Sequence, residues 1–106
     1  MDIQLDQKDF QTTIENKRNV LIDFYADWCG PCQTLLPTVE KLAKEYEGEV
    51  TIKKVNVDQN QQLAAAFGVR SIPTLVQLTD GKEIGRIVGL VTEKDLRSKL
   101  DKQKSA

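Results

Sequence analysis

The sequence predicts an α/β fold in which a mixed β-sheet lies between helices. Short apolar runs typical of buried strands alternate along the chain with segments of helical periodicity. An Asp80-Gly81 pair between two further apolar runs predicts a β-hairpin near the C-terminal end. The chain has 106 residues and a hydrophobic content of 40%, enough for one core. We therefore expect one domain spanning residues 1–106.

The predicted elements begin with a helix for which Asp6 is a suitable cap. Leu5 can pack against Phe10 at its first turn. Residues 20–26 then form an apolar run without alternation, which predicts a central, parallel strand that is buried on both faces. Asp23 is the charged residue that interrupts this run.

A second helix is predicted over residues 31–47, because apolar residues recur there at helical spacing along one face. These residues are Leu35, Val39, Leu42 and Tyr46. Gly48 is a natural end for this helix. Residues 50–58 are predicted to form the next strand, and residues 63–67 a short helix that Gly68 closes.

The last third of the chain predicts a hairpin and a final helix. Residues 74–78 and 83–88 are the strands on either side of the hairpin turn. A Thr92-x-x-Asp95 capping box marks the start of the last helix. The first strands require right-handed crossovers and are expected to be parallel, whereas the hairpin adds antiparallel strands on one side.

Composition excludes several classes of partner. The net charge is −1, with 15 basic and 16 acidic residues spread along the chain, so no basic stripe indicates nucleic-acid binding. The apolar runs are too short to cross a membrane. Residues 1–6 lack the basic start and apolar core of a secretory signal, so we expect a cytoplasmic protein.

Cys29 and Cys32 are the only cysteines, and their Cys-x-x-Cys spacing indicates a redox pair. Cytosolic cysteine pairs are more often catalytic than structural. A structural zinc site is disfavoured because it requires four ligands and the chain has no histidine. A stabilising disulfide is disfavoured because the loop is minimal. Gly30 and Pro31 are untypical of a core segment, which disfavours two inert buried thiols.

Disulfide exchange explains why the two thiols are so close in sequence. One thiolate must attack a target disulfide, and a second thiol must then attack the mixed disulfide that results. Cys29 lies at a predicted helix start, where unpaired N–H groups favour negative charge, so we expect it to be the exposed nucleophile. Cys32 is expected to be more buried and to act as the resolving thiol. Pro31 suits the first helical turn.

Trp28-Cys29-Gly30-Pro31-Cys32 resembles the active site of the thioredoxin family residue for residue. The similarity covers essentially the whole chain and continues through Asp23-Phe24, Pro37, Asn56-Val57-Asp58, Ile72-Pro73-Thr74 and Val88-Gly89. The resemblance implies a thioredoxin-like three-layer α/β/α sandwich with a central mixed sheet. It also implies a monomeric protein-disulfide reductase without bound cofactor or metal. Such a protein takes electrons from an NADPH-dependent thioredoxin reductase and passes them to oxidised client proteins.

Two interpretations of Asp23 remain open at this point. Its charge could be balanced by an ion pair with Lys54, which shares the inward parity of Ile52. The resemblance implies instead that Asp23 lies beneath the cysteines and takes the proton of Cys32 during resolution. Both interpretations can hold together, and the second is favoured.

The resemblance also implies a client-docking surface around the cysteines. It comprises Trp28, Gly30, Pro31, Ile72, Pro73 and Gly89. The Ile72-Pro73 bond is expected to be cis, with the Ile72 backbone pairing with an extended client segment. The simpler interpretations are a strand-edge proline, a half-buried tryptophan and a flexible glycine at a strand end.

Two other functions compete with a general disulfide reductase. The chain could be a dedicated reductant of one enzyme or pathway. It could also be a redox-independent accessory subunit whose partner needs the fold but not the thiols. The second is ranked well below the reductase because the complete cysteine motif is present.

Overall fold

A computed structural model describes residues 2–106, and its elements follow the predicted order of helices and strands. The elements are α1 (Gln7–Asn16), β1 (Asn19–Tyr25), α2 (Gly30–Glu45), β2 (Thr51–Asn56), α3 (Gln61–Ala66), β3 (Thr74–Thr79), β4 (Lys82–Val88) and α4 (Glu93–Ser105).

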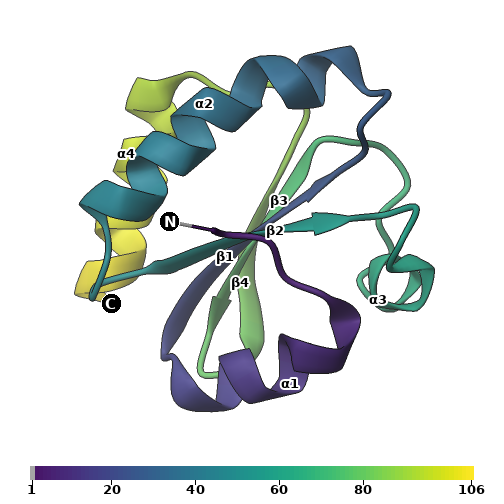
Figure 1. Ribbon diagram of the computed structural model, residues 1–106. Coiled ribbons are helices and arrows are strands. Elements are labelled where there is room, and N and C mark those ends of the chain that lie inside the picture. The colour runs from purple at the N-terminus through teal and green to yellow at the C-terminus, as the bar shows by residue number, and fades with distance from the viewer. Residues whose placement is uncertain (1) are drawn as a thin grey trace.

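The four strands form one mixed sheet in the order β2-β1-β3-β4 (Figure 1). The first two strands are parallel, with Asp23 of β1 paired to Lys54 of β2. β3 lies on the other side of β1 and is antiparallel both to it and to β4. Every residue of β1 is buried, as the apolar run predicted for a central strand.

Helices cover both faces of the sheet, which confirms the three-layer α/β/α class (Figure 1). Because side chains alternate along a strand, neighbours in β1 enter different cores. Leu21 packs in the core beneath α2 and α4, whereas Ile22 packs in the core beneath α3 and α1. Asp23 has the parity of Leu21, so it points to the face that α2 covers.

The hairpin turn and the first helix differ in how well local sequence predicts them. Asp80 and Gly81 have φ values of 51° and 78°, the positive angles that a tight Asp-Gly turn requires. Asp6 lies at the N-cap of α1, but its side chain makes no capping bond. The predicted cap is therefore wrong. The N–H of Gln7 donates instead to Oδ1 of Asn60, which lies just before α3, at 2.8 Å.

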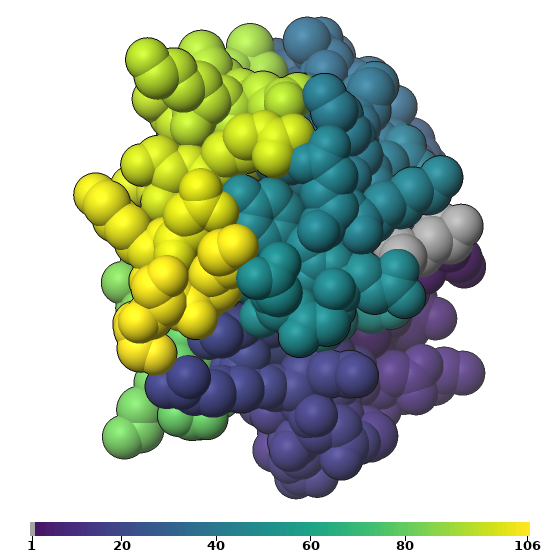
Figure 2. Space-filling view, turned by 90° about the vertical axis from the view of Figure 1, so that its left-hand side faces the viewer, coloured from purple at the N-terminus to yellow at the C-terminus, as the bar shows by residue number. Residues whose placement is uncertain are grey.

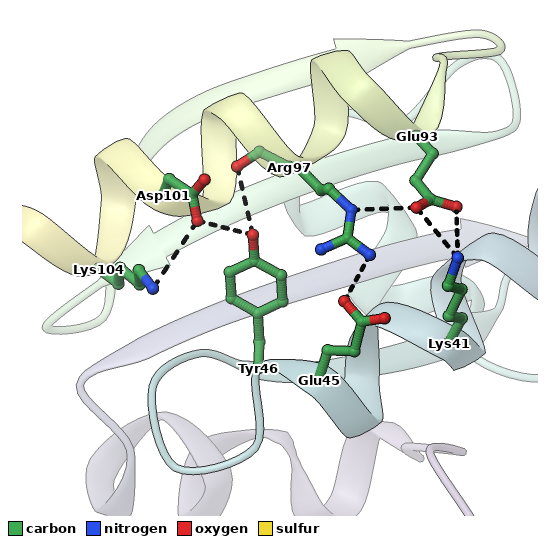
Figure 3. A network of polar contacts seen from close by, with 7 residues as sticks. All are labelled: Lys41, Glu45, Tyr46, Glu93, Arg97, Asp101 and Lys104. Carbon is green, nitrogen blue, oxygen red and sulfur yellow. Dashed lines mark hydrogen bonds and ion pairs between the residues drawn. The ribbon is translucent and has the colours of Figure 1, made fainter.

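The C-terminal part of α2 is joined to α4 by polar contacts. Figure 2 shows the C-terminal helix, in yellow, lying against the teal part of the chain. Tyr46 donates to Asp101 at 2.7 Å, and Lys41 lies 3.2 Å from Glu93. The contacts join Lys41, Glu45 and Tyr46 to Glu93, Arg97, Asp101 and Lys104 (Figure 3). This network fixes the helix end that is far from the cysteines.

Candidate active site

Cys29 and Cys32 are joined by a disulfide at the start of α2, so the structure holds the oxidised form of the pair. Their Cα atoms are 5.3 Å apart. Cys29 is the N-cap of α2, and its Sγ accepts the N–H of Cys32 at 3.2 Å. Pro31 lies in the first helical turn, as predicted. A sulfur at this position receives both an N–H donor and the positive end of the helix dipole.

The two cysteines differ in burial, but less than the sequence led us to expect. Cys29 is 5% exposed and Cys32 is 1% exposed. The order is as predicted, but the expectation that Cys29 is an exposed residue is wrong. Its Sγ is bonded to Cys32 and lies 3.8 Å from the carbonyl oxygen of Ile72, in the loop before β3.

Trp28 precedes the disulfide and is 73% exposed, so it is not a half-buried core aromatic. Its indole N–H donates to Oδ2 of Asp58 at 2.8 Å. The N–H of Asp58 in turn donates to Oδ1 of Asn56, the last residue of β2. The indole is therefore held at one edge while its ring faces solvent.

Gly30 and Pro31, between the two cysteines, are both exposed. A Cβ atom added at Gly30 would have no heavy atom within 4 Å outside its immediate neighbours. The local fold therefore does not require glycine at this position, and space is left beside the disulfide.

The loop before β3 faces the disulfide, and the end of β4 lies against it. The Ile72-Pro73 bond is cis, as the resemblance implies. The N–H of Gly89 donates to the carbonyl oxygen of Pro73 at 2.8 Å. Gly89 has a φ of 91°, which disfavours any residue with a Cβ. The backbone conformation therefore explains why glycine occupies this position.

Val88 and Leu90 flank Gly89 and are 59% and 58% exposed. Neither residue was predicted from the sequence to belong to the client-docking surface. Two large apolar residues on either side of a glycine at the end of a strand are the signal that could have identified them.

Asp23 is completely buried, and neither of its carboxylate oxygens has a hydrogen-bond partner within residues 2–106. Burial raises the pKa of this carboxyl to about 7, although the positive charge of Lys54 opposes the rise. A carboxyl with such a pKa exchanges its proton near neutral pH, which is the property that a general base needs.

Lys54 is the cross-strand neighbour of Asp23, but the interpretation of the two as an ion pair is wrong, since neither carboxylate oxygen has a partner within residues 2–106. The Lys54 ammonium lies over the ring of Tyr25, 5.3 Å from its centroid. Lys54 thus acts on Asp23 through space, as the effect of its charge on the carboxyl pKa indicates.

Two further features bear on the expected partners. Within residues 2–106, no cluster of three or more histidine, cysteine, aspartate or glutamate side chains is arranged to hold a metal ion. None of the helices in the same range has both the length and the apolar character needed to cross a bilayer.

Comparisons with known proteins give one consistent result. The thioredoxin family model matches residues 2–102. A thioredoxin of Chlorobaculum thiosulfatiphilum is 44% identical over 89% of this chain and 88% of its own length. A thioredoxin of Staphylococcus aureus is 40% identical over 94% of this chain and 95% of its own. A solved mutant thioredoxin of Halobacterium salinarum superposes with a TM-score of 0.90 at 40% identity, covering 97% of this chain and 90% of the other.

Proposed function

The chain belongs to the thioredoxin family, and from this premise we propose how its residues reduce the disulfides of client proteins. Family membership and the cysteine pair make it a thiol–disulfide oxidoreductase that acts as a protein-disulfide reductase. Its electrons reside in the Cys29 and Cys32 sulfurs, so the proposed cycle needs no bound cofactor or metal.

In the first step, the Cys29 thiolate attacks one sulfur of a client disulfide. A bond forms between Cys29 Sγ and that sulfur, the client S–S bond breaks, and the other client sulfur leaves as a thiolate that takes up a proton. The position of Cys29 at the start of α2 supports this role, since the Cys32 N–H and the helix dipole stabilise negative charge on its sulfur.

In the second step, Cys32 resolves the mixed disulfide. Its thiol gives a proton to the Asp23 carboxylate, and the resulting thiolate attacks Cys29 Sγ. The Cys29–Cys32 bond forms as the client sulfur leaves, so two electrons have moved to the client. The buried, unpaired carboxyl of Asp23, on the sheet face that α2 covers, supports this assignment.

Clients dock on the surface around the disulfide, whose residues are exposed or half-buried apart from Pro73, which is buried. The proposed surface comprises Trp28, Gly30, Pro31, Ile72, Pro73 and Gly89, extended by Val88 and Leu90. The proposed acceptor for a backbone N–H of an extended client segment is the Ile72 carbonyl, and its distance of 3.8 Å from Cys29 Sγ supports this role.

The family works with a reductase and with client proteins, and we assign an NADPH-dependent thioredoxin reductase as the donor. Its role is to return two electrons to the Cys29–Cys32 disulfide.

Residues 1–106 are taken as one thioredoxin domain that acts as a monomer, binding neither nucleic acid nor membrane. A compartment with reduced thiols suits this activity, which supports a cytoplasmic location.

The observation that carries the proposal is the disulfide at the N-cap of α2. The test is reduction of insulin with a thioredoxin reductase and NADPH, repeated with dithiothreitol in place of the enzyme. The parent chain should turn over, and Cys29→Ser should lose about a thousandfold or more. Cys32→Ser should trap the client on Cys29, because the mixed disulfide cannot resolve. Tyr46→Phe, at the far end of α2, is the control that should retain activity.

Two outcomes would revise this proposal in different ways. Insulin reduction that proceeds with dithiothreitol but fails with thioredoxin reductase and NADPH would refute the assigned electron donor. It would leave the reductase chemistry intact. Rescue of a deletion phenotype by the double Cys29→Ser, Cys32→Ser variant would favour the accessory-subunit alternative.

A further inference from the structure

Lys54 is placed beside Asp23 by the sheet but does not bind it. The two residues are partners in the parallel ladder of β1 and β2, and both point to the face that α2 covers. Because the two residues are register partners on that face, a change of rotamer would bring the flexible Lys54 side chain to the carboxylate. Its ammonium instead lies over the aromatic ring of Tyr25, so another interaction competes with the ion pair.

The Tyr25 ring is held in place on several sides. The residue is 6% exposed and packs in one cluster with Ala26, Cys29 and Cys32. Its hydroxyl donates to Oε1 of Gln4 at 2.8 Å. The ring therefore has little freedom to move away from the cation it faces.

The backbone that carries Gln4 is also attached to Lys54. The Lys54 N–H donates to the carbonyl oxygen of Ile3 at 2.8 Å, and the N–H of Leu5 donates to the Lys54 carbonyl at 2.9 Å. Ring, amide and ammonium thus belong to one assembly of residues 3–5, β1 and β2.

We infer that Tyr25 is a positioning residue that holds the Lys54 ammonium away from Asp23, so that the carboxylate stays unpaired and can accept the proton of Cys32. This inference rests on the proposed role of Asp23 and adds to it the residue that keeps its neighbouring charge at a distance. The attraction between an ammonium and an aromatic face strengthens as water is excluded, and here the half-buried Lys54 lies over a ring of which 6% is exposed.

Lys54 is the charged group whose effect on the pKa of Asp23 opposes that of burial, the larger of the two. β2 contributes the charged Lys54 and β1 the neutral Tyr25. Cys29 and Cys32, which pack with Tyr25 at the start of α2, are joined in a disulfide in the oxidised protein. β3 places the apolar Leu75 opposite Asp23. An ion pair with Lys54 would lower the pKa of the carboxyl and make it a weaker base.

The test measures the pKa of Asp23 directly, by NMR titration of its carboxyl carbon in the oxidised protein. Tyr25→Leu should free the ammonium to reach Asp23 and lower the pKa from about 7 to about 6 or below. Tyr25→Phe keeps the aromatic face and should leave the pKa near its parent value. Pentafluorophenylalanine at this position keeps the ring size but reverses its charge distribution, and should act like Tyr25→Leu.

Lys54→Met separates this effect from simple hydration of a cavity. In the Lys54→Met background, Tyr25→Leu should no longer lower the pKa of Asp23, since no ammonium is present to move. An equal decrease with and without Lys54 would overturn the inference, as would an unchanged pKa in both Tyr25→Leu and the fluorinated variant.

Tyr46→Leu is the matched control. Tyr46 is also buried, and the Lys104 ammonium lies 5.4 Å from its ring centroid, but this pair is at the other end of α2. The variant removes a similar aromatic ring and should leave the pKa of Asp23 unchanged. A decrease equal to that of Tyr25→Leu would overturn the inference by showing a general loss of packing.

A kinetic measurement separates this inference from the proposed function. In Tyr25→Leu, the pH profile for resolution of the mixed disulfide should move to lower pH along with the carboxyl pKa. A parent chain that cannot reduce insulin refutes the proposed function, whatever the titrations show. Normal reduction together with no coupling between Tyr25 and Lys54 refutes only the inference.

Discussion

The polar groups at the two ends of α2 differ in whether they have hydrogen-bond or ion-pair partners. At the C-terminal end, Tyr46 and the charged groups around it have partners across the α2–α4 boundary (Figure 3). At the N-terminal end, the Asp23 carboxyl beneath the helix has no hydrogen-bond partner among the residues that the structure describes, and Trp28 is largely exposed.

The comparison separates residues that stabilise the fold from residues that act on a client. A satisfied network joins two helices and contributes modestly to stability. A buried carboxyl without a partner costs stability, and an exposed indole contributes little to it. Such residues are retained where chemistry or binding needs them.

Asp23→Asn should give the largest change. The folded pKa of about 7 lies above the reference value of 3.8, so the folded state resists ionisation that the unfolded chain undergoes. The parent should therefore lose stability as the pH rises from about 4 to about 7, by up to about 4 kcal/mol. The amide does not ionise, so the variant should gain stability relative to the parent over that range.

Guanidinium unfolding of the oxidised proteins at several pH values between 4 and 8 measures this difference. Asp101→Asn is the control at the other end of α2. It removes a carboxylate that has partners, so it should bring no gain in stability. A difference between Asp23→Asn and the parent that stays constant across the pH range would contradict the assignment of an ionisable, unpaired carboxyl.

Trp28→Ala should affect binding more than folding. Its side chain is exposed apart from the edge held by Asp58, so the free energy of unfolding should change by about 0.5 kcal/mol or less. The KM for a protein client should rise roughly tenfold, because an exposed aromatic beside the reacting sulfur is a typical binding hot spot. Insulin-reduction kinetics and thermal melts together measure the two effects; an unchanged KM would remove Trp28 from the docking surface.

Arg97→Met should give the smallest change, confined to the far end. The guanidinium contacts Glu45 and Glu93, all three side chains being partly exposed, so the ion pairs are screened by solvent and salt. We expect the melting temperature to fall by about 3 °C or less at low salt, and the difference to shrink in 1 M salt. A decrease that is independent of salt would point to lost packing of the arginine stem.

The sequence alone determined the order of the elements, the position of the hairpin turn and the redox pair. These features depend on neighbours along the chain. Asp80-Gly81 sets the turn because its φ angles are local. Cys29 and Cys32 could be recognised because disulfide exchange requires their short spacing. The central position of β1 followed from its apolar composition.

Tertiary structure decided the features that depend on distant segments. Asn60 takes the N–H that Asp6 was expected to cap, because α3 lies against the start of α1. The carbonyl oxygen of Ile72, 43 residues further along the chain, lies 3.8 Å from Cys29 Sγ. Tyr25, and not Asp23, receives the Lys54 ammonium. Strand parity places both candidates on the same face, so only packing in three dimensions could select between them.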